Sequence, residues 1–490
     1  MSIHWPIIKS CLREPGGIAL VDDRRAMKRV ELLVAAMHVA DALSTKCRSR
    51  TVGCLTPTSA AFPIVALAAW MLGKVVVPLN FLLKKEELQY VINDCETDTI
   101  VTVQPMLDYM GYTPEAANIL KLEDLDFKSV PDIRWPASAS DDDLAVLLYT
   151  SGTSGKPKGV MLSHGNITAN IDQACEFARF TRNDKLLGVL PQFHSFGMTV
   201  LTLLPLARSI PVVYTARFVP HKIIQLIREH RPTFLVAIPS MYNALLHVKD
   251  ASPEDFASLR YIVSGGEPLP DAVASSFKER FGVAINEGYG LTETAPVTNW
   301  CTPEEYRPHS VGRTLPRIDQ RIMDPATGAW LPPGHDGEVL IKGPNVMQGY
   351  FKLPEETAKA LDSRGYLHTG DMGRFDSDGH LYITGRIKEM LIIGGENVFP
   401  REIEEVLNRH PAVNASGVIG KRDPIRGELP VAFVEFKEGQ TATERELQMW
   451  CRQSLAGYKV PDEVRVLPAL PRNPTGKIMR RELKGMITPA

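Results

Sequence analysis

A glycine-rich stretch near residue 150 has the residue types of a phosphate-binding loop. The ten residues from Thr150 to Gly159 are drawn only from Thr, Ser, Gly, Lys and Pro. They follow the apolar run LAVLLYT, which predicts a buried parallel strand, and precede GVMLSHGNITANI, which predicts a strand and then a helix capped by Ser163 or Asn166. At such a turn, backbone N–H groups can converge on an anion, and hydroxyls and lysines add donors. The alternative is a mobile surface loop, which an isolated run of this composition usually is.

The spacing of this stretch excludes one common kind of phosphate loop. In the pattern G-x-x-x-x-G-K-[ST], four residues separate the two glycines. Counting from Gly152, the second glycine would fall at Pro157. The stretch is therefore not the phosphate loop of kinases or GTPases of that type.

The composition narrows the class of protein. The 490 residues, 44% of them apolar, predict roughly two to four folding units with a large core. The formal charge of −2 gives no support for nucleic-acid binding, which usually goes with a basic excess. The seven cysteines form no C-x-x-C pair and predict reduced thiols in a cytoplasmic protein. No signal peptide is evident. The most apolar stretch, Ala60 to Gly73, is short of the roughly twenty residues of a membrane span and predicts a buried helix.

The segments that must position the loop alternate between strand and helix. Strands are predicted at Lys74–Asn80 and Asp98–Val103, with a helix at Lys84–Cys95 between them. The same order recurs where HKIIQLIREHRP is followed by TFLVAIP, and SLRYIVSGGEPLP puts a further strand before a glycine turn. This alternation predicts an α/β fold, with parallel sheets covered by helices and ligands bound at the carboxyl ends of the strands.

Two changes in composition divide the rest of the chain. After about residue 305, short strands interrupted by Pro, Gly and Asp predict a β-rich subdomain. From about Glu389, the sequence predicts a small α+β unit with a hairpin, a helix, two strands and two more helices. The boundary is placed at Arg386–Glu389, which gives a large N-terminal domain of residues 1–387 and a small C-terminal domain of residues 388–490.

The stretch YTSGTSGKPKGV resembles the signature of the adenylate-forming (AMP-binding) superfamily, which holds acyl- and aryl-CoA synthetases, firefly luciferase and peptide-synthetase adenylation domains. The family's further motifs follow in order: PQFHSFG, SGGEPLP, NEGYGLTET, YLHTGD, GRIKEMLIIGGENVFPREIEE and PRNPTGKIMRREL. The resemblance covers nearly the whole chain and is weakest before about residue 50. It implies that ATP and Mg²⁺ activate a carboxylic acid as an acyl-adenylate, with release of pyrophosphate. Because GGENVFPREIEE is more similar to acyl-CoA synthetases than to peptide-synthetase domains, the expected second step is thioester formation with coenzyme A.

The difficulty of this chemistry is electrostatic. A carboxylic acid is already ionised at pH 7, so no general base is needed, but an anion must attack a polyanion. The resemblance implies that Lys477 bridges the carboxylate and the α-phosphate, that Glu293 binds Mg²⁺, and that Thr292 contacts the α-phosphate. The pair Thr292–Glu293 would also suit the first turn of a helix.

The resemblance also implies residues that enclose the rest of ATP. The β- and γ-phosphates would be held by Thr150, Ser151, Gly152, Thr153, Ser154, Gly155 and Lys158. The adenine would be enclosed by Gly266, Glu267, Pro268, Glu287, Gly288 and Tyr289, with the tyrosine stacked on the base. Asp371 would bind both ribose hydroxyls, with Arg386 nearby. In isolation, the GYG and Gly-Asp motifs would be plain turns.

Lys388 stands where the family has its hinge. The resemblance implies that the small domain is mobile and rotates about this residue after adenylation. The rotation would withdraw Lys477 and bring in Gly394 and Gly395, against which the pantetheine arm of coenzyme A would pass. The two glycines also suit a hairpin turn.

The acyl pocket would be lined by His194, Phe196, Met241, Gly265 and Gly290. Amino-acid-activating relatives generally place an Asp in the carboxylate-pocket turn, where it pairs the substrate ammonium. The turn FHSFG has His194 and no Asp, which favours an uncharged fatty or aryl acid, since a buried cation without its partner is costly. His194 could instead be a structural histidine. The glycines at 265, 266 and 290 would leave room for an extended tail.

Several alternatives stay open at this level. They are the chain length of the acid, transfer to acyl carrier protein instead of coenzyme A, peripheral contact with a membrane, and activation of an amino acid. A different class would be a catalytically silent nucleotide-binding protein, whose mark would be the loss of Lys477 or Glu293. Both residues are present.

Overall fold

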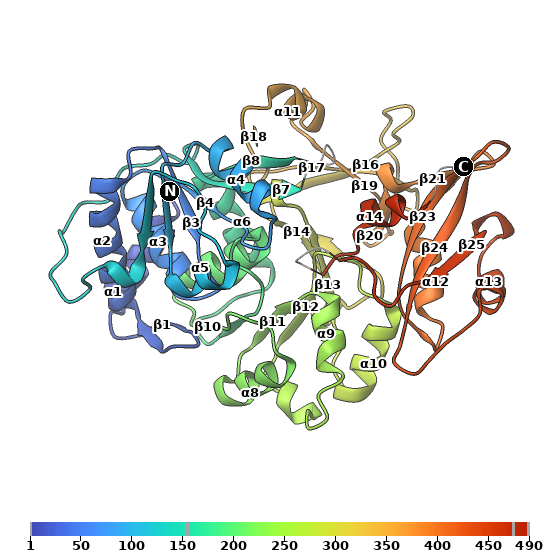
Figure 1. Cartoon of the computed structure of the whole chain (residues 1–490), viewed down its shortest axis with the longest axis horizontal. Coiled ribbons are helices and arrows are strands. Elements are labelled where there is room, and N and C mark those ends of the chain that lie inside the picture. Colours follow the sequence, from blue (N-terminus) through green and yellow to red (C-terminus); the bar gives the residue numbers. More distant parts are fainter. Residues whose placement is uncertain (1, 152–155, 473–475, 488–490) are drawn as a thin grey trace.

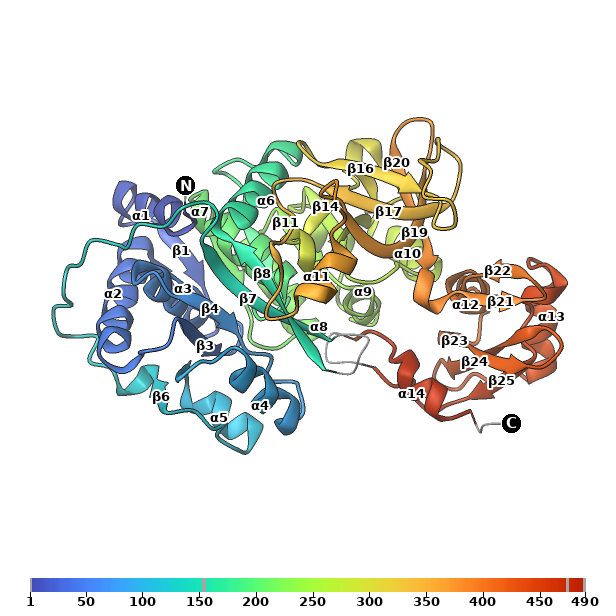
Figure 2. The ribbon, with the colours of Figure 1, turned by 90° about the horizontal axis from the view of Figure 1, so that it is seen from above.

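The computed structural model describes residues 2–151, 156–472 and 476–487, which form a large α/β unit followed by a small α+β unit (Figure 1). Seen from above, the small unit lies at one end of the molecule, beside the strands β19 (Leu367–Phe375) and β20 (His380–Arg386) (Figure 2). The predicted fold class is confirmed.

One seven-stranded sheet carries the glycine-rich stretch. Its strands, in spatial order, are β18 (Gly349–Tyr350), β8 (Pro157–Ser163), β7 (Leu144–Ser151), β4 (Val75–Pro78), β3 (Thr51–Leu55), β5 (Thr99–Thr102) and β6 (Asn118–Lys121). The pairs from β7 to β6 are parallel. The central strands are buried along their length because helices cover both faces of such a sheet. The helices of this region are α2 (Arg29–Lys46), α3 (Ala61–Met71), α4 (Lys85–Asp94), α5 (Gln104–Met110) and α6 (His164–Phe177).

The second sheet of the large unit has thirteen strands among the described residues. Its parallel part comprises β1 (Ile18–Val21), β10 (Val212–Tyr214), β9 (Leu186–Gly188), β11 (Phe234–Ala237), β12 (Tyr261–Ser264) and β13 (Asn286–Gly290), in this spatial order. Strand β2 (Ala26–Lys28) pairs antiparallel with β1 and forms this edge of the sheet. From β13 the sheet continues by antiparallel pairing through β14 (Val297–Trp300), β15 (Gly312–Thr314), β20, β19, β17 (Gly337–Lys342) and β16 (Asp319–Met323). The predicted β-rich region is therefore present, and its strands extend the main sheet.

The remaining helices lie at the amino terminus or follow strands of the second sheet. They are α1 (His4–Arg13), α7 (Leu204–Ala207), α8 (Pro220–His230), α9 (Pro239–Leu245), α10 (Asp271–Phe281) and α11 (Pro354–Ala360). The predicted buried helix near residue 65 is α3, every residue of which is buried. Within the described ranges, no helix is both long and apolar enough to cross a membrane.

The small unit contains the elements predicted for it. They are β21 (Leu391–Ile393), β22 (Glu396–Val398), α12 (Pro400–Asn408), β23 (Val413–Asp423), β24 (Gly427–Phe436), α13 (Glu444–Arg452) and α14 (Arg480–Gly485). The structure adds one strand that was not predicted, β25 (Glu463–Val466), which pairs parallel with β24. Its strands form a separate sheet, with their own buried clusters of apolar side chains. Separate sheets and cores are what two folding units require.

Contacts between the units include several ion pairs and hydrogen bonds. Arg409, just after α12, reaches Asp271 at the start of α10, with its Nε 2.7 Å and its NH2 2.5 Å from Oδ2. The other oxygen of Asp271 lies 3.1 Å from Nδ1 of His309. Arg401 donates to the carbonyl of Ile383 at 2.5 Å. An interface made of a few ion pairs and hydrogen bonds is typical of domains that can change orientation.

Candidate active site

The glycine-rich stretch begins in one strand and ends in another that pairs with it. Strands β7 and β8 pair antiparallel, with Thr150 opposite Lys158 and Ser151 opposite Pro157. The predicted parallel strand before the stretch is confirmed, since β7 is parallel to β4 on one side. On the other side it is antiparallel to β8, a direction that the sequence left open. Apolar runs of this kind do not reveal strand direction, since both neighbours bury the same side chains. The predicted phosphate ligands Gly152, Thr153, Ser154 and Gly155 lie outside the described residues.

Lys158, at the base of the hairpin, has a carboxylate partner that the sequence analysis did not identify. Its Nζ lies 2.5 Å from Oε2 of Glu356 on α11 and 5.3 Å from the centroid of the Tyr350 ring. The Tyr350 hydroxyl donates to Oε1 of Glu293 at 2.8 Å. Glu293 lies in η4 (Thr292–Thr294), a single 3₁₀ turn, which agrees with the helix-start alternative for Thr292 and Glu293. The predicted phosphate lysine and the predicted Mg²⁺ carboxylate thus share a neighbour, Tyr350.

Asp371 has both carboxylate oxygens engaged by predicted site residues. The Tyr289 hydroxyl donates to Oδ2 at 2.7 Å, and Nε of Arg386 lies 2.7 Å from Oδ1. Strands β19 and β20 place Asp371 directly opposite Arg386. Asp371 is only 2% exposed, and the pKa of Tyr289 is raised well above its ordinary value by burial and by this carboxylate. The tyrosine therefore stays a hydrogen-bond donor at neutral pH.

Two acidic residues predicted to flank the adenine are buried or half-buried. Burial raises the pKa of Glu287 to about 7, and one of its oxygens accepts from the backbone N–H of Leu269 at 3.4 Å. Burial also raises the pKa of Glu267, and the positive charge of Lys477 acts in the opposite direction. Oε1 of Glu267 is buried and has no hydrogen-bond partner among the described residues.

The glycines of these segments have specific backbone roles. Gly266 has φ +83°, a conformation that other residues rarely adopt, and it is followed by the exposed Pro268. Gly288 lies in β13 opposite Trp300. The first adenine segment follows the end of β12, and the second lies within β13, where Glu287 pairs with Ser264, the last residue of β12. Both segments are thus at the carboxyl end of β12, where a parallel sheet binds its ligands.

Lys477 comes from the small unit but lies among charged groups of the large unit. Burial and then Arg386 lower its pKa, while Glu389 and Asp371 act in the opposite direction. Gly476 has φ +92°, and a side chain there would meet Ser240 at 3.1 Å and Ile238 at 3.2 Å. The loop that carries Lys477 is therefore packed against the start of α9, which also carries Met241.

Arg480 anchors this loop within the small unit. It donates to both oxygens of Glu404 on α12, at 2.8 and 2.7 Å, and lies 3.1 Å from Glu389. Such two-pronged pairing fixes geometry as well as charge. The position of Lys477 is thereby tied to α12 and to the turn beside Lys388.

His194 precedes the π-helix η2 (Phe196–Leu203), and Met241 lies in α9. Burial lowers the pKa of His194 to about 4, so its imidazole is neutral at pH 7, and Nδ1 accepts from the N–H of Phe196 at 3.4 Å. The half-buried His194 thus has a local structural contact and supplies no positive charge.

The glycines predicted to leave room for a long acyl tail do not do so at two positions. A side chain at Gly265 would lie 2.6 Å from the ring of Phe196, and one at Gly290 would lie 1.9 Å from the carbonyl oxygen of Pro296. The space beside each glycine is occupied by its neighbour. Glycine is required there by close packing, and these two positions carry no information about tail length.

The predicted hinge and thiol segments lie at the start of the small unit. Lys388 is exposed in η6 (Ile387–Glu389), between β20 and β21. Gly394 and Gly395 form the turn between β21 and β22, with φ +62° and +89° and open space around both. The hairpin-turn alternative is correct for the fold, and the open surface is compatible with a chain passing along it.

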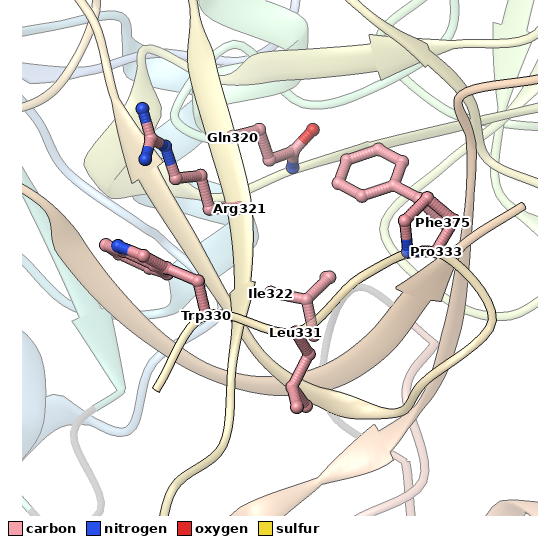
Figure 3. A pocket seen from close by; sticks show the side chains of 7 residues that line it. All are labelled: Gln320, Arg321, Ile322, Trp330, Leu331, Pro333 and Phe375. Atoms are coloured by element: carbon pink, nitrogen blue, oxygen red, sulfur yellow. The ribbon is translucent and has the colours of Figure 1, made fainter. Parts of the chain in front are cut away.

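A cavity of about 210 Å³ lies elsewhere, in the β-rich region (Figure 3). Its walls come from β16, β19 and the connection between β16 and β17, and its lining comprises Gln320, Arg321, Ile322, Trp330, Leu331, Pro333 and Phe375. None of the described residues predicted for the site lines it.

Comparison with known proteins agrees with the arrangement of these motifs. The model of the AMP-binding enzyme family matches residues 8–351, and that of the AMP-binding enzyme C-terminal domain matches residues 402–477. A feruloyl-CoA synthase of Amycolatopsis sp is 32% identical over 98% of both chains. A long-chain-fatty-acid–CoA ligase of Bacillus subtilis is 34% identical over 84% of this chain and 81% of its own. The crystal structure of ATP-bound MatB from Rhodopseudomonas palustris is 31% identical, with a TM-score of 0.90 over 99% of both chains.

The chain therefore belongs to the AMP-binding enzyme family, the adenylate-forming superfamily. Within it, the protein is a member of the acyl- and aryl-CoA synthetase branch, the AMP-forming acid–thiol ligases, which use ATP, Mg²⁺ and coenzyme A.

Proposed function

We propose that this enzyme activates an uncharged fatty or aryl acid as its adenylate and transfers the acyl group to coenzyme A. One observation carries the choice of acid. The turn predicted to contact the acyl chain holds a neutral His194 and no acidic residue, so it offers a charged acyl chain neither a counter-anion nor a counter-cation. Burying an unpaired charge there would be costly.

In the first half-reaction, the substrate carboxylate attacks the α-phosphate of ATP and pyrophosphate leaves. We propose that Lys477 stabilises the negative charge that develops between the two, and that Thr292 orients the α-phosphate. The surroundings of Lys477 support this role, because Arg386 and Asp371 of the large unit act on its pKa and its own charge acts on the pKa of Glu267. Fixed positive charge in a partly buried site is the main catalytic device for such a reaction.

The nucleotide would be held at the edges of both sheets. We assign the phosphates to the hairpin residues Thr150 and Ser151, the loop residues 152–155, and Lys158. Asp371 and Arg386 would bind the ribose, and the segments Gly266–Pro268 and Glu287–Tyr289 the adenine. Mg²⁺, which neutralises phosphate charge, would be held by Glu293, whose carboxylate is half-buried and oriented by Tyr350.

The second half-reaction requires a different environment at the adenylate. We propose that residues 388–490 form a mobile domain that rotates about Lys388, replacing Lys477 by Gly394 and Gly395. The polar contacts between the units are consistent with such a motion. The present orientation is more similar to ATP-bound MatB, with a TM-score of 0.90, than to apo MatB, with 0.80.

The free acceptor thiol is proposed to be coenzyme A, with acyl carrier protein as the alternative acceptor. We place the enzyme in the cytoplasm, where its seven free cysteines, six of them buried, would stay reduced. Contact with a membrane surface would be peripheral.

A pyrophosphate-exchange screen tests the proposal. Fatty, aryl and amino acids would each be offered with ATP and Mg²⁺. An acid that bears a second anionic group would be included as well. The reason is that a sulfoacetate–CoA ligase of Cupriavidus necator is also a relative, at 34% identity over 89% of this chain and 87% of its own. We expect exchange with fatty or aryl acids, and thioester when coenzyme A is added. Exchange with amino acids alone would overturn the proposal, and thioester on acyl carrier protein but not on coenzyme A would overturn the choice of acceptor.

A further inference from the structure

The segment from Met347 to Ala360 joins two predicted phosphate-binding features, although none of the sequence motifs includes it. Strand β18 pairs antiparallel with β8, and the N–H of Phe351 donates to the carbonyl of Gly159 at 2.8 Å. At the other end, the N–H of Met347 donates to the carbonyl of Glu293 at 2.8 Å. The segment therefore connects the strand that carries Lys158 to the turn that carries Glu293.

Helix α11 in this segment supplies the carboxylate that faces Lys158. The side chain of Lys158 is 15% exposed, and its Nζ lies 2.5 Å from Oε2 of Glu356. The other oxygen, Oε1, lies 2.8 Å from Nζ of Lys359, whose side chain is 72% exposed. The carboxylate of Glu356 thus contacts two lysines: the shielded Lys158 on β8 and the solvated Lys359 on its own helix, α11.

The charge state of this pair follows from its contacts. Hydrogen bonds from Lys158 and Lys359 lower the pKa of Glu356 to about 2, so the carboxylate is ionised at neutral pH. A lysine that is to bind phosphate must turn its ammonium toward the phosphate oxygens. An ionised carboxylate in contact with the same ammonium competes for it and repels the incoming polyanion.

We propose that Glu356 is a positioning residue that acts through Lys158. It holds the ammonium at the base of the hairpin when the nucleotide is absent, and the β- and γ-phosphates of ATP take its place as the partner of the lysine. Release of pyrophosphate restores the ion pair. The inference deepens the proposed function and rests on its assignment of Lys158 to the phosphates.

The test is a titration of the enzyme with Mg·ATP in the absence of any carboxylic acid, with Glu356→Gln as the main variant. The amide keeps the size of the side chain but removes the competing charge. We expect the Kd for Mg·ATP to fall about two- to fivefold, the range of a partly exposed ion pair that is lost. In steady state, the KM for ATP falls while the KM for the carboxylic acid is unchanged.

A double-mutant cycle separates this role from a general electrostatic or structural effect. Adding Glu356→Gln to Lys158→Met should leave the Kd for Mg·ATP the same as in Lys158→Met alone, since no ammonium remains for the carboxylate to compete for. Glu355→Gln, on the same helix and exposed, is the matched control and should change nothing. Thermal melting checks that each variant is folded.

Two outcomes overturn the inference: an unchanged or raised Kd in Glu356→Gln, or the same change in the Lys158→Met background. Failure of the proposed function has a different signature. Exchange with amino acids alone, or thioester on acyl carrier protein only, would leave the effect of Glu356→Gln on Mg·ATP binding in place, whereas an unchanged Kd in Lys158→Met alone would remove the assignment of Lys158 to the phosphates.

Discussion

Lys158 and Lys477 are both assigned to the phosphates of ATP, but they are held in opposite ways. Lys158 is fixed in a strand of the large unit and contacts a carboxylate at 2.5 Å. Lys477 is carried by the small unit, in a loop packed on α9, where burial and Arg386 lower its pKa. The first lysine thus contacts an ionised carboxylate before the substrate arrives, whereas burial and a neighbouring guanidinium destabilise the ammonium of the second.

From this difference we infer that Lys158 contributes to the binding of ATP and Lys477 to the chemical step. A cation that already contacts a carboxylate contributes to binding, because phosphate only replaces one anion by another. A cation whose charged form is disfavoured by burial gains most where negative charge develops, which is the transition state of adenylation. Removing each lysine should therefore affect different kinetic constants.

The largest effect is expected from Lys477→Ala. The rate of adenylate formation should fall about 10²–10³-fold, the usual cost of removing one donor from developing charge. Thioester formation from preformed acyl-adenylate and coenzyme A should be preserved, because the proposed rotation of the small unit withdraws Lys477 before that step. Pyrophosphate exchange measures the first reaction, and product analysis with synthetic adenylate measures the second. Lys484→Ala, exposed on α14, is the control. Equal loss of both reactions would contradict the inference that Lys477 acts in the adenylation step.

The next effect concerns alkaline pH. An ordinary lysine has a pKa near 10.4. Burial lowers the pKa of Lys477, so its ammonium loses a proton at a lower pH than an ordinary lysine does. The adenylation rate should therefore decline as pH rises through this lowered pKa, approaching about tenfold per pH unit above it. Lys477→Arg should lose this alkaline decline, since a guanidinium stays protonated. If the decline persists in Lys477→Arg, another group is responsible.

A smaller effect is expected from Lys158→Ala. The KM for ATP should rise by about tenfold, as for the loss of one charged hydrogen bond, while thioester formation from preformed adenylate is unchanged. Initial rates at varied ATP measure it. Lys156→Ala is the control, since this neighbour is exposed and its Nζ lies 5.4 Å from the centroid of the Tyr90 ring. A lowered kcat with an unchanged KM would place Lys158 in the chemical step and remove the contrast with Lys477.

The smallest effect should come from the ion pair between the units. Arg409→Ala removes the contact with Asp271 that favours the present orientation. Exposed pairs of this kind are worth about 0.2–1 kcal/mol, so adenylation should slow relative to thioester formation by about two- to fivefold. The ratio of the two half-reaction rates is the measurement, and Arg445→Ala, exposed on α13, is the control. An unchanged ratio would show that this pair does not influence the orientation.

The sequence predicted the order of elements well because periodicity and turn residues are local signals. The helix and strands of the small unit and the buried helix α3 are examples. The antiparallel direction of β8 was not foreseen, since an apolar run carries no information on which neighbour it pairs with. The roles of Gly265 and Gly290 were also misjudged, because the groups that fill the space beside them come from Phe196 and Pro296.

The partners of the predicted site residues were mostly not foreseeable. Glu356 is 198 residues from Lys158, and Tyr350 is 57 residues from Glu293. Neither Glu356 nor Tyr350 belongs to a pattern that indicates a phosphate site, and only the pairing of β18 with β8 brings them there. A motif identifies the residues that contact the ligand more readily than those that hold them in place.

The burial of the cysteines has a practical consequence for observing the motion of the small unit. Six of the seven thiols are buried, and burial raises the pKa of the seventh, Cys175, to about 11, so that little reactive thiolate exists at neutral pH. Two cysteines introduced at exposed positions, one in each unit, should therefore react with fluorescent maleimides far faster than the native ones. Energy transfer between the two dyes could then follow the orientation of the units during turnover without first removing any native cysteine.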